Sequence, residues 1–395
     1  MTVVQINVSD FGSTGAIVRQ IRDSALAEGS SVHCFFGRVS GRIPDEKRVG
    51  NVFSTLFHVF LARIGLNGHG SYFATKKLCR ELEKLDPDVI ILHNVHGYYI
   101  HLKTLFETLA KTKKTKIYWF MHDAWAFTGR CAYFSAVNCE QWKDPEGAAK
   151  SKRCASCPYG HRKYPRSLLD TAKREFAYKK QLFTMLPVDR TVLVSPSEWL
   201  KSEISQSFLS KYRCTVRKNE PDTSVFYKRS ESEIKEAAAL YGIPLEKPVV
   251  LSVAMVWDDR KQLPVVVEIA RKLPDHTVCA VGLSKKQLRE FSRKKGKLAP
   301  SQKGFVPGNF IPLGRTSSPA GLASLYSLAD VLVNPSLEDN YPMVPLEAQA
   351  CGTPVVSSNT CGSPETVTNG IVVKDARSAD AYIEAIKKIT GGTTV

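Results

Sequence analysis

The stretch from residue 330 to residue 356 restricts the fold more narrowly than any other part of the sequence. An apolar run, Val331–Val333, ends at turn-forming residues. A short helical segment follows, closed by Gly352 and Pro354, and a second apolar run begins at Val355. Strand, loop, helix and strand in this order form the repeating unit of a parallel sheet. The chain is therefore predicted to have an α/β fold.

The loop and helix of this stretch carry polar side chains, among them Asp339, Asn340 and Glu347. In an open parallel sheet, ligands bind beyond the carboxyl ends of the strands, and a helix N-terminus there offers backbone N–H groups to phosphate. Carboxylates accept hydrogen bonds from sugar or ribose hydroxyls. The stretch predicts either a nucleotide-sugar site or an ordinary strand–helix connection with solvated acidic side chains.

Two acidic residues separated by seven others, ahead of a helix of small residues, resemble the signature of the retaining GT-B glycosyltransferases of family 4. Asp339 and Glu347 have this separation, with Asp where the family usually has Glu. The segment Asp339–Pro342 is similar to the branch that builds bacterial exopolysaccharide, colanic-acid-like polymers and O-antigen. The resemblance covers nearly the whole chain.

The resemblance implies a GT-B fold, in which two Rossmann-like, doubly wound domains face each other across a cleft. A chain of 395 residues is long enough for two such domains. Residues 1–215 are predicted to form the acceptor-side domain, with a Cys-rich insertion at 131–157. Residues 216–395 are predicted to form the domain that binds the nucleotide-sugar.

Gly12 and Gly15 follow a predicted first strand at 3–8 and precede a helix predicted to begin near Ala16. Two glycines three residues apart let the backbone approach a ligand closely, although a plain turn fits the same residues. In the resembled family this loop lies against the donor diphosphate and the acceptor, which implies donor binding by both glycines.

His122 ends a predicted strand at 116–121 and is followed by Asp123 and a glycine-bearing loop. A histidine in this position either meets a ligand or is a capped core residue. The resemblance implies that His122 contacts the donor sugar near the reacting carbon. Upstream, His93, His96 and His101 lie within nine residues; they could bind a metal ion, whereas the resemblance implies that their segment shapes the cleft wall.

Four cysteines, Cys131, Cys139, Cys154 and Cys157, lie in the loop-like insertion, and the last two form a C-x-x-C pair. Four thiolates around a tetrahedral ion would hold together a segment that has little core of its own. The sequence is compatible with a structural zinc ion and also with four free thiols.

Arg260 and Lys261 follow a predicted strand at 248–254, where a guanidinium and an ammonium group could bind a diphosphate. The same pair at a helix start could instead be solvated surface. The resembled family has Arg-Lys-Gly here, so Gln262 departs from the pattern. It also has Gly-Arg where this chain has Ala254-Met255, so one usual phosphate ligand is missing or comes from elsewhere.

The net charge is +17, and the first half holds most of it: residues 1–185 carry 28 Lys and Arg against 16 Asp and Glu. Such a surface predicts an anionic partner. No nucleic-acid-binding signature is found, so no nucleic acid partner is expected. The Phe-rich segment 51–66 has apolar residues at helical spacing, with Lys76, Lys77 and Arg80 shortly after it. It is either a core helix or a helix that lies in a lipid interface.

The segment Met1–Val8 has no basic region and no long apolar core, and no apolar run reaches the length that spans a bilayer. We therefore expect a cytoplasmic protein that binds peripherally to the inner face of the plasma membrane.

Together these features predict transfer of a hexose-type sugar from a nucleotide-sugar, a UDP-sugar, to a glycan or undecaprenyl-diphosphate-linked acceptor. The resemblance implies a metal-independent, front-face mechanism with retention, in which the departing phosphate oxygen takes the acceptor proton. Catalytic roles fall to His122, Arg260, Lys261 and Asp339, and Asn340 and Glu347 bind donor hydroxyls. No cofactor is expected for catalysis. The alternative is a non-catalytic GT-B partner that binds a nucleotide-sugar or glycan within a synthase complex.

Overall fold

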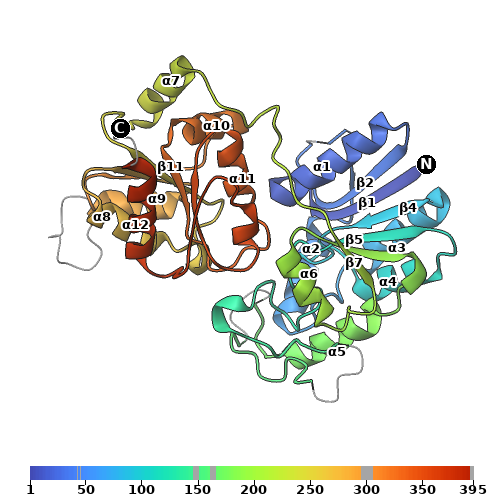
Figure 1. Cartoon of the computed structure of the whole chain (residues 1–395). Helices are drawn as coiled ribbons and strands as arrows, with labels where there is room; N and C mark the ends of the chain where they lie inside the picture. Colours follow the sequence, from blue (N-terminus) through green and yellow to red (C-terminus); the bar gives the residue numbers. More distant parts are fainter. Residues whose placement is uncertain (42, 45, 146–150, 161–165, 295–305, 392–395) are drawn as a thin grey trace. The chain divides into compact units, whose positions relative to one another are not determined.

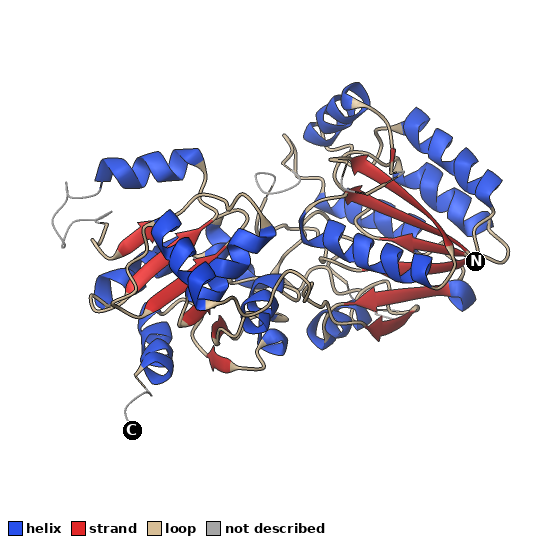
Figure 2. Ribbon diagram, turned by 90° about the horizontal axis from the view of Figure 1, so that it is seen from above, coloured by secondary structure: helices blue, strands red, loops and turns tan. Residues whose placement is uncertain are grey.

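The computed structural model describes residues 1–41, 43–44, 46–145, 151–160, 166–294 and 306–391. The chain folds into two compact units, Met1–Lys218 and Asn219–Val395 (Figure 1). Each is an α/β unit built on a parallel sheet, which confirms the predicted fold class. The ribbon in Figure 2 shows the strands of each unit flanked by helices.

In the described part of the first unit, seven strands form one parallel sheet in the order β3-β2-β1-β4-β5-β6-β7. The strands are β1 (Thr2–Ser9), β2 (Ser31–Arg38), β3 (Lys47–Arg48), β4 (Val89–Leu92), β5 (Lys116–Phe120), β6 (Thr191–Ser195) and β7 (Arg213–Val216). The helices are α1 (Gly12–Ala27), α2 (Val52–Arg63), α3 (Tyr72–Leu85), α4 (Leu102–Lys111), α5 (Ala172–Phe183) and α6 (Glu198–Ser205), with short 3-10 turns η1 (Ser135–Val137) and η2 (Val188–Arg190).

The described part of the second unit has a six-stranded parallel sheet in the order β10-β9-β8-β11-β12-β13. Its strands are β8 (Val249–Val253), β9 (Thr277–Val281), β10 (Phe310–Pro312), β11 (Val331–Asn334), β12 (Val355–Ser358) and β13 (Gly370–Val373). Its helices are α7 (Glu231–Tyr241), α8 (Leu263–Lys272), α9 (Lys285–Lys294), α10 (Pro319–Leu328), α11 (Met343–Ala350) and α12 (Ala379–Thr390), with 3-10 turns η3 (Asp259–Lys261) and η4 (Ser363–Thr366).

Both strand orders reverse direction beside the first strand of the unit, as in a Rossmann-type sheet. The reversal lies between β1 and β4 in the first unit and between β8 and β11 in the second. Connections leave the two central strands there toward opposite sides, which opens a crevice at their carboxyl ends. The loops after these four strands are therefore where each unit can bind a ligand.

Strand side chains alternate between the two faces of each sheet, and each face has its own helices. In β8, Val250 packs with Val266 of α8 and Ile386 of α12. Its neighbour Leu251 packs instead with Leu325 of α10. Burial on both faces explains why the strands read as continuous apolar runs in the sequence.

Helix α1 begins at Gly12, so the start predicted near Ala16 is wrong. Both glycines of the candidate loop therefore lie in the first turn of the helix. A Cβ on Gly15 would come within 2.4 Å of the backbone carbon of Asp10, so only glycine lets the chain turn this sharply from β1 into α1. Helix α6 begins with a side-chain cap, because Ser197 accepts a hydrogen bond from the Leu200 N–H (3.0 Å).

The Phe-rich segment forms α2 and does not face the core. Its apolar side chains point into solvent, with 82% of Phe53 exposed and more than half of Phe57 and Phe60. Only His58 and Ala62 of this helix are buried. The core-helix interpretation is therefore wrong. No helix among the described residues is both long enough and apolar enough to cross a membrane.

A substitution at Gly282, which follows β9, tests how closely the backbone there approaches the loop after β8. Its φ is +95°, and an added Cβ would lie 1.8 Å from the Ala254 carbonyl oxygen. We expect Gly282→Ala to lower the free energy of unfolding by at least about 2 kcal/mol, because both strain and a backbone clash result. Urea unfolding followed by circular dichroism measures this.

The matched control is Gly242→Ala. Gly242 also has a positive φ (+63°), but nothing lies within 4 Å of the added Cβ. This variant should lose only about 1 kcal/mol from backbone strain. Equal losses in the two variants would contradict the close approach of Gly282 to the loop after β8.

Candidate functional site

An ion pair joins the loops that follow β8 and β11 at the switch point of the second sheet. The Lys261 ammonium Nζ lies 2.5 Å from Asp339 Oδ2 and 3.1 Å from Ser336 Oγ. Only 18% of the lysine side chain and 15% of the aspartate side chain are exposed. The structure thus brings together two residues that are far apart in the sequence and that were both predicted to act in catalysis.

Arg260 is held against the same acidic loop by its side chain and by its backbone. Its Nη1 donates to the Glu338 carbonyl (3.2 Å), and its own carbonyl accepts from the Leu337 N–H (2.8 Å). Asp258 also lies 3.0 Å from the guanidinium. These bonds fix a cation at the carboxyl ends of the strands, where a diphosphate could bind.

Gln262 stands where the resembled family has the glycine of Arg-Lys-Gly, and it still adopts the left-handed backbone of the turn. Its φ is +51°, a left-handed conformation that favours glycine and costs another residue about 1 kcal/mol. The buried side-chain amide Nε2 donates to the carbonyls of Pro335 and Ala376. Each such bond contributes about 1 kcal/mol, which offsets the strain. Gln262 therefore ties η3 to the loop after β11.

Arg315 was not identified from the sequence. It follows β10, and its Nη2 donates to the Met255 carbonyl (3.0 Å). Met255 is the position at which the resembled family has arginine, and its own side chain is 60% exposed. The Arg315 guanidinium, from the loop after β10, therefore lies beside Met255, where this chain has no arginine. In the sequence, the only signal was the Gly314-Arg315 pair directly after the apolar residues 310–313.

Glu347 and Asn340 lie on either side of the start of α11. The Glu347 carboxylate accepts a hydrogen bond from the Tyr326 hydroxyl of α10 (3.0 Å). Burial raises the pKa of Glu347 to about 7, although the Tyr326 bond opposes this shift. Asn340 is almost fully buried, with 4% exposed. Glu347 is therefore a carboxyl group that can accept or donate a hydrogen bond near neutral pH.

In the first unit, Gly12 and Gly15 form an N-terminus of α1 that lacks a side-chain cap. Asp10 precedes them, fully buried, and its carboxylate accepts from the backbone N–H and the hydroxyl of Ser40 (2.9 and 2.6 Å). These bonds fix the loop from β1 to α1. The two glycines thus occupy a helix N-terminus at the switch point, where an anion is favourably bound.

His122, after β5, forms a chain of hydrogen bonds with two residues that sequence reasoning did not assign to the site. Its Nε2 lies 2.9 Å from His93 Nδ1, and His93 Nε2 lies 3.1 Å from Gln5 Oε1. Because the amide oxygen of Gln5 can only accept, His93 carries its proton on Nε2 and accepts at Nδ1. His122 then donates from Nε2.

Burial lowers the pKa of His122 to about 4 and that of His93 well below its ordinary value. Both imidazoles are therefore neutral at pH 7. A neutral imidazole with so low a pKa is a weak base, and it is suited to orienting a ligand by hydrogen bonding.

The other two histidines of the 93–101 segment have separate roles. His96 Nε2 lies 2.9 Å from Asp123 Oδ2. His101 accepts from the Thr104 N–H (3.2 Å) and caps α4. With His93 bound to Gln5, the three rings face three different sets of partners. The tertiary structure therefore does not gather them around a common centre.

The four cysteines of the insertion line a single small cavity. Among the residues that the structure describes, no group of three or more His, Cys, Asp or Glu side chains could hold a metal ion. Part of the predicted insertion, 146–150, lies outside the described residues. The structural zinc ion at these four cysteines stays a prediction.

Comparison with known proteins finds a family match within the second unit. Residues 233–391 match the family model described as glycosyl transferases group 1. This segment is similar to the group 1 glycosyltransferases. The matched segment contains five of the predicted site residues: Arg260, Lys261, Asp339, Asn340 and Glu347.

Other known proteins match nearly the whole chain in sequence or in structure. It is 25% identical over 391 residues to a protein of Escherichia coli strain K12 named as a colanic acid biosynthesis glycosyl transferase, WcaC; the match covers 93% of this chain and 85% of that protein. Sucrose-phosphate synthase from Thermosynechococcus elongatus superposes with a TM-score of 0.65 at 16% identity, over 99% of this chain and 90% of that one. Anabaena HepE in complex with UDP-glucose superposes with a TM-score of 0.62 at 14% identity, over 100% and 90%. These likenesses support the GT-B fold that the sequence predicted.

The raised pKa of Glu347 predicts a pH-dependent difference between the wild type and Glu347→Gln. The folded protein holds this proton more tightly than the unfolded chain, whose pKa is near the ordinary 4.5. The resulting stabilisation is present below about pH 4.5 and is lost as the pH rises through about 7. The glutamine variant should therefore gain in melting temperature relative to the wild type between about pH 5 and about pH 8.

Glu236→Gln, an exposed residue of α7, is the matched control and should show a constant difference from the wild type over this range. Thermal unfolding of both variants at several pH values measures the effect. If the difference in melting temperature between Glu347→Gln and the wild type did not change with pH, this would contradict a buried carboxyl at this position.

Proposed function

We propose that the protein is a retaining glycosyltransferase that moves a hexose-type sugar from a UDP-sugar to a lipid-linked glycan in bacterial surface polysaccharide biosynthesis. The observation that carries the proposal is the Lys261–Asp339 pair at the switch point of a segment similar to the group 1 glycosyltransferases. The proposal draws its donor from HepE, which was solved with UDP-glucose, and its acceptor from the relation to the colanic acid protein.

Departure of a nucleoside diphosphate leaves negative charge on phosphate oxygens, and preorganised cations stabilise it in the transition state. Arg260 and Lys261 are such cations, since both are fixed to the loop after β11. Arg315 lies within the same set of loops and is proposed as a third. We propose that these side chains supply the charge stabilisation without a metal ion.

The acidic loop is proposed to recognise the donor through its hydroxyls. Asp339 holds the Lys261 ammonium with Oδ2, and carboxylates have further acceptor positions for sugar hydroxyls. Asn340 offers an amide with donor and acceptor groups at the start of α11. Glu347 is proposed to bind the ribose, where a pKa near 7 lets the carboxyl either accept or donate.

His122 is proposed to orient the sugar near the reacting carbon and not to remove a proton. Its low pKa makes it a poor general base at neutral pH, and its Nε2 proton is already directed at His93. The acceptor hydroxyl would therefore lose its proton to the departing phosphate oxygen, on the same face of the sugar. This is the front-face route, which retains the anomeric configuration.

We expect Lys261→Met to lower the rate of sugar transfer at least about 100-fold, because one preorganised charge on the leaving group is lost. Asp339→Asn should also slow transfer, since it releases the ammonium from its fixed position. Release of UDP from UDP-glucose in the presence of a lipid-linked acceptor, and thermal shift with UDP-glucose, measure catalysis and binding separately.

Lys235→Met is the matched control, because Lys235 is an exposed lysine of α7 with only a surface partner, Glu231. It should keep the wild-type rate. Wild-type activity in Lys261→Met would refute the catalytic proposal. Binding of UDP-glucose without any transfer in the wild type would support the alternative of a non-catalytic partner subunit, which the departure at Met255 favours.

An anionic membrane surface is the proposed location of the acceptor, and the surface that would meet it is centred on α2. The apolar patch comprises exposed side chains of α2, the start of α3 and the segment before α5: Val52, Phe53, Leu56, Phe57, Phe60, Phe73, Leu168 and Leu169. Its parts are joined in the fold. Leu168 donates its N–H to the Arg63 carbonyl (2.6 Å), and a Cβ on Gly50 would contact both Ser54 of α2 and Ala74 of α3.

Basic residues accompany this apolar patch. Lys76, Lys77 and Arg80 of α3 are exposed, and the chain as a whole has a net charge of +17. Phenylalanines that enter the acyl boundary beside lysines that meet anionic headgroups are typical of interfacial helices. We therefore propose that the protein binds peripherally at the cytoplasmic face of the membrane.

Replacing Phe53, Phe57 and Phe60 together by serine should abolish most sedimentation with phosphatidylglycerol vesicles, because the apolar contribution to binding is removed. Raising the salt concentration should weaken binding of the wild type, because the basic residues contribute electrostatically. The control is Leu240→Ser with Leu245→Ser, two exposed leucines of the second unit. Equal vesicle binding by the two multiple variants would argue against α2 as the docking face.

A further inference from the structure

We propose that Arg38, Arg63 and Arg174 bind the phosphate of an amphiphile, a phosphate or diphosphate joined to a long apolar chain, whose chain lies on the apolar patch around α2. Taking this amphiphile as the lipid-linked acceptor rests on the proposed function. Nothing in the sequence set these three arginines apart, because they come from different elements of the first unit, β2, α2 and α5.

The apolar patch lies at the carboxyl-end side of the sheet in the first unit. Helix α2 follows the end of β3, and α3 leads back toward the start of β4, so the turn between these two helices lies at that side. Two contacts place the turn and the start of α3 against the loop after β4. Leu102 donates its N–H to the Gly68 carbonyl (2.9 Å), and His101 donates its N–H to the Thr75 hydroxyl (2.8 Å). The patch is therefore next to the strand ends at which a ligand can bind.

Tyr98 joins α2 to the loop after β4. Its ring meets the His58 ring of α2 edge to face, with the ring centres 5.9 Å apart. Its φ is +70°, a backbone conformation that residues other than glycine rarely adopt and that clusters at ligand-binding sites. Burial raises the pKa of Tyr98, and the two charges that most oppose this shift are those of Arg63 and Arg38. Both arginines therefore act on this side chain, one from α2 and the other from β2.

Arg38 extends over the switch point of the first sheet. It ends β2, and its exposed side chain donates from Nη2 to the Gly97 carbonyl in the loop after β4 (3.4 Å). Because β1 lies between β2 and β4 in the sheet, this side chain reaches across the carboxyl end of β1. The Arg38 carbonyl in turn accepts from the Asp10 N–H (3.4 Å). The guanidinium is therefore close to the loop that carries Gly12 and Gly15.

Arg63 and Arg174 lie close to the turn at Gly65, where α2 ends. The Arg63 Nη1 donates to the Arg166 carbonyl (3.2 Å), and the Arg63 carbonyl accepts from Leu168, a residue of the apolar patch (2.6 Å). Arg174, in the first turn of α5, donates from Nη2 to the Gly65 carbonyl. A guanidinium has five N–H donors, so one bond to a carbonyl leaves others for a phosphate. These two cations are therefore placed at the edge of the patch.

The positive charge of this region is not balanced by acidic side chains. Among the residues that the structure describes, Arg38, Arg63 and Arg174 form no ion pair with a carboxylate. Glu175 also acts on Tyr98, but its buried carboxylate already accepts from Thr171 and Asn67 (2.6 and 3.3 Å). Guanidinium groups bind phosphate by charge-assisted hydrogen bonds. Their position at the border of an apolar surface matches an anion that is attached to an apolar chain.

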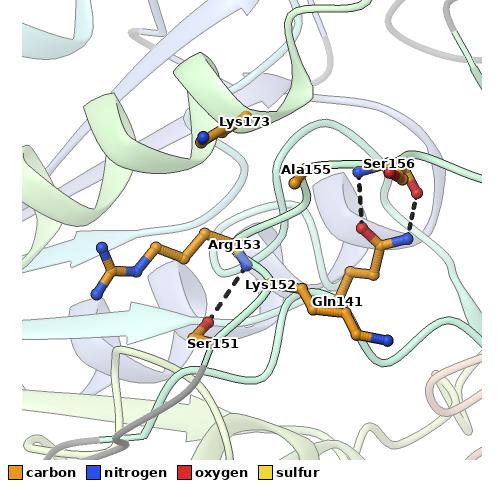
Figure 3. Close-up of a pocket in the computed structure, with 7 residues that line it drawn as sticks. All are labelled: Gln141, Ser151, Lys152, Arg153, Ala155, Ser156 and Lys173. Carbon is orange, nitrogen blue, oxygen red and sulfur yellow. Dashed lines mark hydrogen bonds between the residues drawn. The ribbon is translucent and has the colours of Figure 1, made fainter.

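A second group of cations lines a pocket in the insertion and supplies the matched control. Figure 3 shows Lys152, Arg153 and Lys173 around this pocket, which has a volume of about 550 Å³. Arg153 already lies 3.9 Å from the Asp144 carboxylate. Lys173 is the neighbour of Arg174 in α5 and is also exposed, but it lines this pocket, whereas Arg174 reaches the turn after α2. Comparing the two positions separates the proposed site from a general effect of positive charge.

The test is binding of farnesyl diphosphate to the full chain, measured by equilibrium dialysis below the concentration at which this ligand forms micelles. Inorganic diphosphate is the probe for the anion alone, and farnesol is the probe for the chain alone. We expect farnesyl diphosphate to bind at least about 10-fold more tightly than either, because only this ligand engages both the arginines and the apolar patch.

Arg38→Gln, Arg63→Gln and Arg174→Gln combined should weaken binding of farnesyl diphosphate at least about 10-fold, because the charge-assisted hydrogen bonds to the phosphate are lost. Lys173→Gln should bind as the wild type does. Arg38→Gln and Arg174→Gln as single variants change exposed positions, so they keep the proposal testable if the triple variant does not fold. Each single variant should weaken binding more than Lys173→Gln.

Sedimentation with phosphatidylglycerol vesicles distinguishes an acceptor site from general contact with lipid headgroups. The triple arginine variant should keep most of its vesicle binding, which depends on the phenylalanines of α2 and the basic residues of α3. If it lost vesicle binding to the same extent as binding of farnesyl diphosphate, the arginines would serve the bilayer surface and the proposal would be overturned.

The proposal would also be overturned if the wild type did not bind farnesyl diphosphate, or if the wild type and the arginine variants bound it equally. Weaker binding in the arginine variants of a protein that transfers no sugar would support the proposed site and count only against the proposed function. Failure of the site and failure of the proposed function are therefore measured separately.

Discussion

The ion pair between Lys261 and Asp339 is the interaction on which the candidate site of the second unit depends. Both side chains are largely withdrawn from water, so each charge would be costly without the other. The pair joins the loop after β8 to the loop after β11, and the bonds of Arg260 and Gln262 to the second loop reinforce the connection. The two loops on either side of the switch point thus form one fixed frame, in which cations and acceptors already have their positions.

The first unit uses the opposite electrostatic arrangement at its own switch point. His93 and His122 are neutral because burial disfavours their charged forms, and a fixed set of proton positions links them to Gln5. Carboxylates also lie nearby, but they have partners: Asp10 accepts from Ser40, and Asp123 lies 2.9 Å from His96. A neutral polar surface suits a sugar ring, and a charged frame suits a diphosphate.

Departures from the family pattern are compensated by residues distant in sequence. Gln262 takes the left-handed conformation that glycine would otherwise adopt and recovers the cost through two buried hydrogen bonds. Arg315 places a guanidinium beside Met255, where the pattern has an arginine. Neither compensation can be read from the local sequence, because the partners lie on other strands and become neighbours only when the sheet forms.

The sequence by itself determined the α/β class, most strand positions and the residues that lie after the central strands. It could do so because buried parallel strands leave continuous apolar runs and because ligand-facing loops follow them in order. It did not determine the outward orientation of α2, since apolar residues at helical spacing fit a core and an interface equally. The partners of Glu347 and His122 were decided only by the tertiary structure. Protonation depends on burial and on neighbours brought from distant strands, and these exist only once the chain has folded.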